Sequence, residues 1–454
     1  MTSSMKKKIT QLQQGQVPKG YQMTRLGIAP NDWMMFRIGD CLERVERPVD
    51  VQADKLYTQI GIRSHGKGLF YKEPVTGAEL GNKAVFWIEP DCFILNIVFA
   101  WEQAIGKTTQ AEEGMIGSHR FPIYRPINNR ADTDYLIYYF LTKRGKEILE
   151  AASPGGAGRN KTLGQDRFLK SKIILPPLAE QRKIAKILAT QDRVIELKKK
   201  LLEETKNRKK ALLKMLMCPT EMKRLEAASP RGEAASCRFG DNNKLVFMGD
   251  IGFAYTGIIG KGKEDFGKGD AWYIPFLNVL KNTKIDLGNL VRVNVSKSEK
   301  QNVVQKGDLF FNISSETPDE VGLCAFLANK AERTYLNSFC LGFRLKPDAK
   351  IEPHYLAEWF NSCYGRRIMR SLAQGVTRYN LSREGLLSTP INLPPLPIQR
   401  YIAAILSAAD REIDLLRQDL EQEEQKKKAL MQLLLTGIVR VNGKEAAGSR
   451  FSTK

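Results

Sequence analysis

The chain has few of the residues from which metal centres and nucleophilic catalytic sites are built. Its 454 residues include only 3 histidines, and no His-Glu-x-x-His motif or clustered carboxylate pattern accompanies them. The 7 cysteines contain no Cys-x-x-Cys pair, so they indicate neither a zinc ribbon nor a disulfide framework, and we interpret them as reduced thiols of a cytoplasmic protein. We therefore predict neither a catalytic residue nor a metal ligand in this chain.

Two glycine-containing stretches come close to a phosphate-binding loop, but each lacks an essential residue. After the stretch from Gly61 to Lys67, Gly68 stands where serine or threonine must hold magnesium, and the stretch around Gly106 has Trp101 in place of the first glycine. The Asn-Pro-Pro-Tyr and Asp-Pro-Pro-Tyr tetrapeptides of enzymes that methylate amino groups are also absent. The sequence thus predicts no cofactor-binding residue.

Long apolar runs and acidic charge are both scarce. The most apolar run, Cys92 to Trp101, has about half the length that a membrane-spanning helix needs, and no apolar signal segment follows the basic first residues. The 71 lysines and arginines outnumber the 50 acidic residues and leave a formal net charge of +21. This surplus favours a polyanionic partner, most simply nucleic acid, although improved solubility is an alternative explanation. We expect no membrane partner.

One long stretch of the chain occurs twice. The stretch from Ile173 to Met217 returns without a gap from Ile391 to Leu435, at an offset of 391 − 173 = 218 residues. Roughly half of the aligned positions are identical, which chance does not supply over such a length. The chain is therefore a tandem duplication.

Each copy of the repeat predicts a long helix with a narrow apolar seam. Both open with Leu-Pro-Pro-Leu, which suits the start of a helix, and both stop at a helix breaker, Pro219 in the first copy and Gly437 in the second. The seam alternates at spacings of three and four, most clearly at Ile402, Leu406, Ala409, Ile413, Leu416, Leu420, Leu430 and Leu434. Gln191, Lys198 and Thr205 interrupt the seam of the first copy. The obvious partner of each helix is the other copy, and two unrelated bundle helices are the alternative.

The blocks in front of the two helices share a skeleton but little else. Each has short β-type runs, then a helical stretch (134–150 and 354–369), then a glycine-containing loop (153–164 and 373–382). Residues 221–243 between the halves have the small, polar composition of a linker. Two copies with a common frame and divergent loops predict one scaffold that reads two different ligands.

The repeated motifs resemble those of a known family. The two Leu-Pro-Pro-Leu segments, the Gln-Arg pairs at 181 and 399, the Lys-Lys-Ala-Leu runs at 209 and 427 and the terminal Leu-Leu-Thr-Gly at 434 are similar to the specificity subunit of type I restriction-modification systems. The resemblance covers nearly the whole chain. One departure is that the acidic residue before the glutamine, Glu180 in the first copy, is Ile398 in the second.

The resemblance implies a fold and a set of partners. It implies an α+β chain with an internal pseudo-two-fold repeat, in which two mixed target recognition domains are joined and separated by an antiparallel coiled coil of the two helices. Each domain would read one half of a bipartite site in double-stranded DNA. The chain itself would be non-catalytic and would recruit two adenine methyltransferase subunits and two motor-nuclease subunits. S-adenosylmethionine, ATP and magnesium would belong to those partners.

Combining the repeat with this resemblance gives expected domain boundaries. We expect the first recognition domain at 1–172, the first helix at 173–220, a linker at 221–243, the second recognition domain at 244–390, the second helix at 391–437 and a tail at 438–454. The role of residues 1–30 is not predicted.

Candidate DNA-contacting residues are basic, amide or hydroxyl side chains in glycine-flanked or polar loops, because such groups bind phosphates and base edges. Two sets, Arg159, Asn160 and Lys161 and then Gln374, Thr377, Arg378, Tyr379 and Asn380, stand in equivalent places before the two helices. Two further loops supply Arg63, Ser64, His65 and Lys67, and Ser314, Ser315 and Thr317. In the last loop the carboxylate of Glu316 can accept a hydrogen bond from cytosine N4.

Two other classes of function remain as alternatives. The chain can be a structural coiled-coil scaffold whose globular blocks bind proteins, or an enzyme hidden in the divergent blocks. A scaffold has no need of two basic, glycine-containing loops in equivalent places, and an enzyme should display a catalytic constellation. An adenine methyltransferase gene next to this one would distinguish a DNA-specificity subunit from both alternatives.

The length of the repeated helices is predicted to set the number of unread base pairs between the two half-sites. Inserting four residues after Thr205 should lengthen one arm by about 6 Å, or nearly two base-pair rises, and shift the seam by half a heptad. We expect the recognised half-sites to stay the same and the unread gap to grow, which sequencing of the methylated sites measures. Changed half-sites with an unchanged gap would show that the helices do not set the distance.

Overall fold

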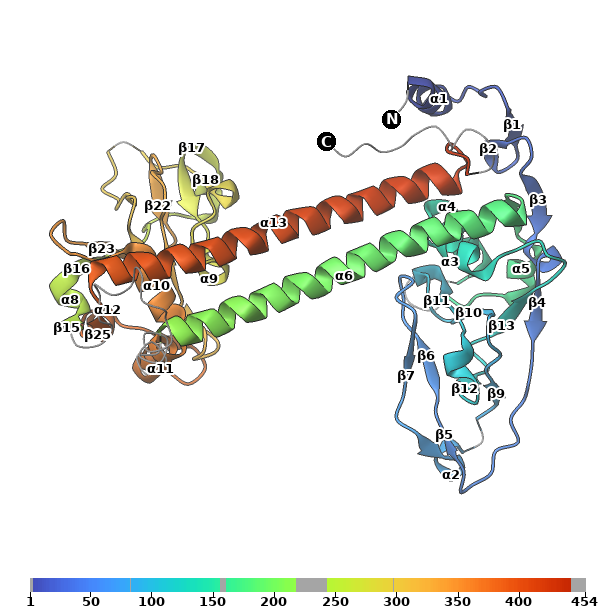
Figure 1. Ribbon diagram of the computed structural model, residues 1–454, viewed down its shortest axis with the longest axis horizontal. Coiled ribbons are helices and arrows are strands. Elements are labelled where there is room, and N and C mark those ends of the chain that lie inside the picture. Colours follow the sequence, from blue (N-terminus) through green and yellow to red (C-terminus); the bar gives the residue numbers. More distant parts are fainter. Residues whose placement is uncertain (1–2, 82, 156–160, 218–242, 297, 442–454) are drawn as a thin grey trace, which may run out of the picture. The chain divides into compact units, whose positions relative to one another are not determined.

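The computed structural model describes residues 3–81, 83–155, 161–217, 243–296 and 298–441 (Figure 1). The chain divides into two compact units, each of which is described by itself. Unit 1 comprises Met1–Lys199 and Asp419–Lys454, and unit 2 comprises Lys200–Gln418. The boundary falls inside two long helices, α6 (Leu178–Met217) and α13 (Leu396–Leu435), so each unit contains part of both.

The central sheet of unit 1 has four antiparallel strands. Their order is β11 (Ile105–Lys107), β10 (Phe93–Leu95), β13 (Ile123–Pro126) and β4 (Leu42–Val45). In the register of β10 and β13, Phe93 lies opposite Tyr124. Both side chains are fully buried together with Phe140 and Phe168, and neighbouring ring centroids lie 5.3 to 5.7 Å apart. This aromatic core fixes the helices α3 (Thr133–Leu141) and α5 (Gln165–Lys170) against the sheet.

The central sheet of unit 2 repeats the same topology. Its order is β16 (Gly252–Thr256), β23 (Cys340–Leu345), β19 (Leu309–Asn312) and β21 (Cys324–Phe326), again antiparallel throughout. In chain order β4, β10, β11 and β13 therefore correspond to β16, β19, β21 and β23. The duplication extends through the divergent blocks, and the fold class expected from the sequence is confirmed.

The remaining elements are short, as the sequence indicated. Those of unit 1 are α1 (Ser3–Gln13), β1 (Tyr21–Thr24), β2 (Gly27–Pro30), β3 (Met34–Arg37), η1 (Ile38–Asp40), β5 (Leu56–Tyr57), β6 (Ile60–Ile62), β7 (Leu69–Tyr71), β8 (Val75–Thr76), α2 (Gly77–Leu80), β9 (Val85–Trp87), η2 (Ala100–Glu102), η3 (Gln110–Glu112), β12 (Ile116–Ser118), α5 (Gln165–Lys170) and β14 (Lys172–Leu175). Those of unit 2 are β15 (Lys244–Phe247), α8 (Met248–Ile251), η4 (Lys263–Asp265), β17 (Phe266–Ile274), α9 (Phe276–Lys281), η5 (Leu287–Asn289), β18 (Val291–Val293), β20 (Ser314–Ser315), β22 (Thr334–Leu336), β24 (Tyr379–Asn380), α12 (Arg383–Leu387) and β25 (Pro390–Leu393).

The repeated stretch begins as a strand rather than as a helix. β14 pairs with β3, and β25 pairs in the same way with β15, so each Leu-Pro-Pro-Leu segment leaves a two-stranded ribbon before its helix starts. The expected helical segments 173–220 and 391–437 are therefore not helical at their first residues. The helices themselves begin at Leu178 and Leu396, directly after the prolines, because proline has no N–H to donate within a helix. Gly437 follows α13 with φ +72°, as expected for a residue past a helix end.

Each helical stretch expected in front of the repeats, 134–150 and 354–369, is in fact two helices. α3 (Thr133–Leu141) and α4 (Lys143–Ala152) meet at Thr142, and α10 (Pro353–Asn361) and α11 (Cys363–Leu372) meet at Ser362. The hydroxyl of each junction residue accepts a hydrogen bond from the N–H of the glycine three residues later. That glycine packs against the preceding helix, where a Cβ would collide with a backbone carbonyl oxygen. This contact explains why both copies have glycine here.

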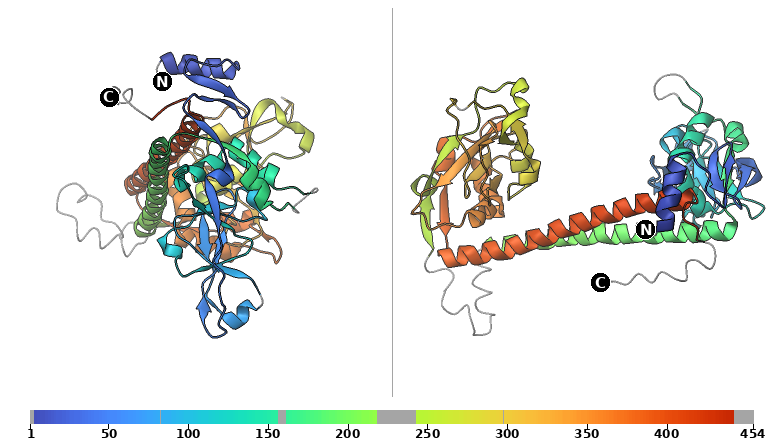
Figure 2. Two further views of the ribbon diagram at one scale, coloured as in Figure 1. Left: turned by 90° about the vertical axis from the view of Figure 1, so that its right-hand side faces the viewer. Right: turned by 90° about the horizontal axis from the view of Figure 1, so that it is seen from above.

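In unit 1, the two long helices lie side by side and run antiparallel (Figure 2). They pair through two of the residues that interrupt the apolar seam. The Gln191 amide donates to a Glu423 carboxylate oxygen at 2.6 Å, and the Lys198 ammonium lies 2.7 Å from Asp419 and 3.2 Å from Glu423. Gln191 is 6% exposed, so its amide depends on this partner. Two of the three interruptions of the first seam, Gln191 and Lys198, are thus matched by acidic residues of the second helix, and the expected antiparallel pairing is confirmed.

Residues 21–33 are fastened to the end of α13 in unit 1. The fully buried Glu180 carboxylate accepts from the indole N–H of Trp33 at 3.3 Å and from the Arg440 guanidinium through two bonds of 2.8 Å. The Tyr21 hydroxyl donates to the Gly437 carbonyl oxygen at 2.7 Å. The hydrogen bonds from Arg440 explain the acidic residue at position 180. Ile398, at the repeat-related position, is instead a buried member of the apolar core of unit 2.

The pairing of Gln191 with Glu423 predicts a pH-dependent stability. The hydrogen bond from Gln191, with help from Lys198 and Lys426, lowers the pKa of Glu423 to about 2 from its ordinary value of 4.5. A lowered carboxyl pKa adds stability above the unfolded-state value and loses it as the pH falls through the folded-state value. The variant E423Q should therefore be less stable than the wild type by about 1 to 2 kcal/mol near neutral pH.

This difference should shrink as the pH falls from about 4.5 to about 2. Thermal unfolding followed by circular dichroism at a series of pH values measures it. E421Q, which removes an exposed carboxylate from the same helix, is the matched control and should change little. A gap between E423Q and wild type that stays constant down to the lowest pH would contradict the assigned role of Glu423.

Candidate nucleic-acid interface

In each unit, a buried asparagine at the end of one central-sheet strand, β10 or β19, shapes the turn that follows. The side-chain oxygen of Asn96 accepts from the N–H of Val98 at 3.0 Å, and that of Asn312 accepts from the N–H of Ser314 at the same distance. Asn96 is 8% exposed and Asn312 is 0% exposed. The two asparagines occupy corresponding places after β10 and β19, so both units present a turn on the same support.

The glycine-containing loops lie beside these turns. The N–H of Leu163 donates to the carbonyl oxygen of Ile97 at 2.8 Å, and the N–H of Leu381 donates to that of Ile313 at 3.0 Å. Positions 163 and 381 differ by 381 − 163 = 218, which is the offset of the repeat. The two loops therefore enter the fold at equivalent points, as the sequence indicated.

In unit 1 the loop from Arg63 to Gly68 is the tip of a β-hairpin formed by β6 and β7. The N–H groups of His65 and Gly66 donate to the carbonyl oxygens of Glu102 and Gln103 at 2.8 and 2.9 Å, which fastens the tip to the turn after Asn96. His65, Gly66 and Gly68 all have positive φ. A P-loop instead joins a strand to a helix, so the hairpin explains these glycines as turn residues.

The four candidate side chains of this tip differ in their surroundings. The Arg63 guanidinium donates to the Leu69 carbonyl oxygen at 2.7 Å and lies over the Phe70 ring, and the Ser64 hydroxyl donates to Glu102 at 3.0 Å. His65 and Lys67 are exposed, and no side-chain hydrogen bond to another described residue restrains them. His65 and Lys67 are therefore directly available to a ligand, whereas the Ser64 hydroxyl is engaged in positioning Glu102.

Lys161 approaches the same turn from the glycine-containing loop. Its ammonium lies 5.2 Å from the ring centroid of Trp101, and the Trp101 indole donates to the Val98 carbonyl oxygen at 3.1 Å. Lys161 and the hairpin tip thus contact adjacent residues of this turn, Trp101 and Glu102. Arg159 and Asn160 lie outside the described residues.

In unit 2 the two sets of candidates form one surface rather than two. Strands β20 and β24 pair so that Ser314 lies opposite Asn380 and Ser315 opposite Tyr379. Gln374 and Asn380 exchange backbone hydrogen bonds of 2.9 and 2.8 Å, which closes the loop between them. The sequence could not indicate this pairing, because each of the two strands has only two residues.

The loop of unit 2 presents most of its candidate side chains to solvent. Gln374, Thr377, Arg378 and Asn380 are exposed, as are Glu316 and Thr317 in the neighbouring turn. Ser315 is instead 7% exposed and donates to Glu320 at 2.7 Å, so its hydroxyl supports the turn from within. Sequence analysis missed Val376, which is 91% exposed at the tip of the loop and has no motif to mark it.

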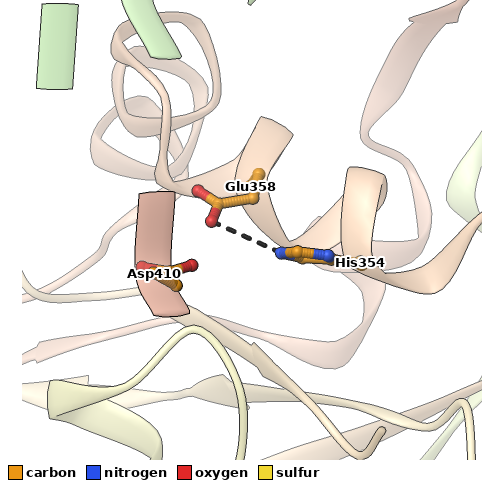
Figure 3. A group of neighbouring side chains, drawn as sticks. All are labelled: His354, Glu358 and Asp410. Carbon is orange, nitrogen blue, oxygen red and sulfur yellow. Dashed lines mark ion pairs between the residues drawn. The ribbon is translucent and has the colours of Figure 1, made fainter. Parts of the chain in front are cut away.

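One grouping of potential metal ligands in the described part of the chain lies in unit 2 (Figure 3). It consists of His354, Glu358 and Asp410, with Nε2 of the histidine 3.6 Å from the Glu358 carboxylate. The Lys209 ammonium lies 2.9 Å from Glu358 and 2.7 Å from Asp410. Burial would raise the pKa of Glu358, but the hydrogen bond with His354 and the charge of Lys209 together lower it.

This grouping is an ion-pair network rather than a metal site. Lys209 already supplies a positive charge between the carboxylates, and it joins α6 to α10 and α13 within unit 2. The first lysine of the Lys-Lys-Ala-Leu motif at 209 thus has a structural role in the packing of these helices. The side chain of Lys209 is only 16% exposed and lies beside the buried Glu358, so it does not belong to the solvated face of α6.

No helix in the described ranges has the length and apolar character needed to cross a membrane. A protein-family model described as the type I restriction modification DNA specificity domain matches residues 30–207 and 241–425. The chain is 25% identical over 445 residues to the putative type I restriction enzyme MjaX specificity subunit of Methanocaldococcus jannaschii, covering 93% of this chain and 97% of that protein. It is 25% identical over 426 residues to the MjaVIII specificity subunit of the same organism, covering 91% and 94%.

Two solved structures share the fold. The S subunit of a type I restriction-modification system from M. genitalium aligns with a TM-score of 0.51 at 13% identity, covering 88% of this chain and 96% of that one. A chain from a study of complex assembly and conformational transition of the type I R-M system aligns with a TM-score of 0.54 at 15% identity, covering 90% and 99%. At such identities the likeness concerns the fold alone.

The exposed loop of unit 2 predicts a base-reading role for Arg378 and Asn380. Alanine at either position should cost about 1 to 3 kcal/mol of DNA-binding free energy and relax the preference in one half-site only. Alanine at Arg159 or Asn160 should affect the other half-site. Binding to libraries of randomised sites measures this, with R411A on the exposed face of α13 as the control. Equal weakening on all sequences, with a shallower salt dependence, would show phosphate contacts instead.

Proposed function

Since this chain belongs to the type I restriction modification DNA specificity family, as a specificity subunit with two target recognition domains, we propose that each domain reads one half of a bipartite site in double-stranded DNA. The observation that carries the proposal is that both units hold a turn in the same way, while the two turns differ in sequence. Asn96 and Asn312 hold their turns through the same hydrogen bond, yet the side chains that follow them differ. A shared frame with different reading groups suits two different half-sites.

The exposed candidate residues divide into two roles. Lys67 in the hairpin tip and Lys161 in the glycine-containing loop carry positive charge beside the turn of unit 1, so they suit phosphate contacts that set the register of the domain on the duplex. Arg378, Gln374 and Asn380 in unit 2 offer the guanidinium and amide groups that form paired hydrogen bonds with guanine and adenine in the major groove. The net charge of +21 supports the non-specific part of this binding.

The long helices would dock the methyltransferase subunits. In unit 1, Leu197 on α6 is 49% exposed, and in unit 2, Leu415 on α13 is 66% exposed. These positions are related by the repeat, since 415 − 197 = 218. Two exposed leucines at equivalent points of two equivalent helices favour two copies of the same partner, because each copy would meet a leucine at the same place on its helix. We extend the proposal to two motor-nuclease subunits by family membership alone.

The chemistry would reside in the partners. The chain would contribute no catalytic group of its own, and S-adenosylmethionine, ATP and magnesium would be bound by the methyltransferase and motor-nuclease subunits. This division of labour places sequence choice and assembly in this chain and methyl transfer in its partners.

The test compares the chain alone with the complex. The purified chain should bind DNA weakly, transfer no methyl group and hydrolyse no ATP, and addition of the cognate methyltransferase subunit should give sequence-specific adenine methylation. Transfer of a labelled methyl group by the lone chain would contradict the proposed division. Methylation by the complex without any sequence preference would contradict the reading role of the two domains.

A further inference from the structure

An open pocket of about 490 Å³ lies in unit 1, where the candidate residues of the hairpin tip and the turn after Asn96 meet. Its wall combines three aromatic rings with a few polar groups, namely Phe70, Phe99, Phe121, Ser64, Lys72 and Glu102. Phe99 is 37% exposed, although large apolar side chains are usually buried. No single stretch of sequence marks this pocket, because its walls come from four separate segments.

Two residues of the frame shape the pocket. A Cβ at Gly61 would collide with the Phe70 ring, so glycine at this position lets the ring lie flat across β6. Asn96 turns the chain so that Phe99 and Glu102 follow on the same side as the hairpin. The shape of the pocket therefore depends on groups that are themselves fixed in the core.

The Glu102 carboxylate is held in place at the wall of the pocket. It accepts a hydrogen bond from the Ser64 hydroxyl at 3.0 Å, and its backbone carbonyl accepts from the N–H of His65 at 2.8 Å. Within the described ranges Glu102 forms no ion pair, although the chain has a large cationic surplus. A fixed, unpaired carboxylate on a surface that faces DNA repels phosphates, so it is favourable there only if a hydrogen-bond donor of a base meets it.

We propose that Glu102 is a specificity-determining residue of the first recognition domain, whose carboxylate accepts a hydrogen bond from an exocyclic amino group in the major groove. Such donors are N4 of cytosine and N6 of adenine. Ser64 is a positioning residue, because its hydroxyl donates a hydrogen bond that orients the Glu102 carboxylate. The inference rests on the proposed DNA-reading function and assigns part of it to a residue that the sequence motifs do not mark.

Apolar and cationic side chains surround the Glu102 carboxylate and can contact the neighbouring parts of the DNA. Phe99 and Phe70 offer apolar edges beside the carboxylate, which suit the ring face or methyl group of a neighbouring pyrimidine. Lys72 at the rim is exposed and supplies a charge for a flanking phosphate. The arrangement thus has a single anionic acceptor for a base, with apolar and cationic groups around it.

The experiment uses the full chain assembled with its methyltransferase subunit and a library of randomised sites. In E102Q the amide keeps the size of the side chain, loses the negative charge and gains a donor. We expect the preference for an amino-bearing base to fall about tenfold or more at one position of one half-site. Whether the lost preference is for cytosine or for adenine identifies the base that Glu102 reads.

Two further variants separate the role of Glu102 from general effects. E113Q removes an exposed carboxylate elsewhere in unit 1 and should leave every preference unchanged. S64A should relax the same position as E102Q but by a smaller factor. The second half-site should remain recognised in all three variants, which shows that the complex is folded and active.

Two outcomes would overturn the inference while leaving the proposed function intact. In each of them the wild-type complex reads two half-sites, and E102Q either keeps every preference or weakens all sequences equally. If the wild-type complex itself shows no preference in either half-site, the proposed function fails instead. The two failures are therefore distinguishable in one experiment.

Discussion

The structure depends on an exchange of helix ends between the two copies of the repeat. Leu434 and Leu435, at the end of α13, are buried in the core of unit 1 with Ile184 and Leu188 of α6. Leu216 and Met217, at the end of α6, are buried in the core of unit 2 with residues of α13 that include Ile402. Neither core is complete without the helix of the other copy. No single helix can bury its own narrow apolar seam. Each helix therefore buries part of the seam of the other, and both contribute apolar side chains to the two cores.

Polar groups define how the two helices pair. Gln191 and Lys198 on α6 meet Glu423 on α13 in unit 1, and Lys209 meets Asp410 and Glu358 in unit 2. A helix that slid by one turn would leave these half-buried amides and charges without partners, at a cost well above that of a lost surface ion pair. The interruptions of the apolar seam therefore specify the register of the antiparallel pair.

The duplication separates support from recognition. The support recurs in both units as a hydroxyl-to-glycine helix junction, a four-stranded sheet of the same order and an asparagine-held turn. The groups that face outward differ, with Phe99 and Glu102 in one turn and Ser314 and Glu316 in the other. Such a division allows loops to change without loss of the core, because the buried residues of the frame are not the exposed residues of the site. It agrees with the proposal that the two recognition domains read unlike half-sites.

The sequence by itself determined the duplication, the two long helices, the basic character of the chain and the family. These features depend on local patterns, such as the Leu-Pro-Pro-Leu starts, the three-and-four spacing of apolar residues and glycine past a helix end. Gly145 and Gly365 stand in the two helical stretches that the sequence indicated, but only the structure showed that each glycine lets two helices meet at a hydroxyl residue.

Tertiary structure alone decided which of the candidate residues lie together. The pairing of Ser314 and Ser315 with Tyr379 and Asn380, and the joining of the hairpin tip to the turn that contains Glu102, connect segments far apart in the chain. Strands of two or three residues carry too few side chains to show a period, so their partners are set by hydrogen bonding and core packing rather than by local preference. The same reasoning explains the partner of Glu180. Nothing near Glu180 in the sequence indicates that Arg440, 260 residues away, supplies its counter-charge.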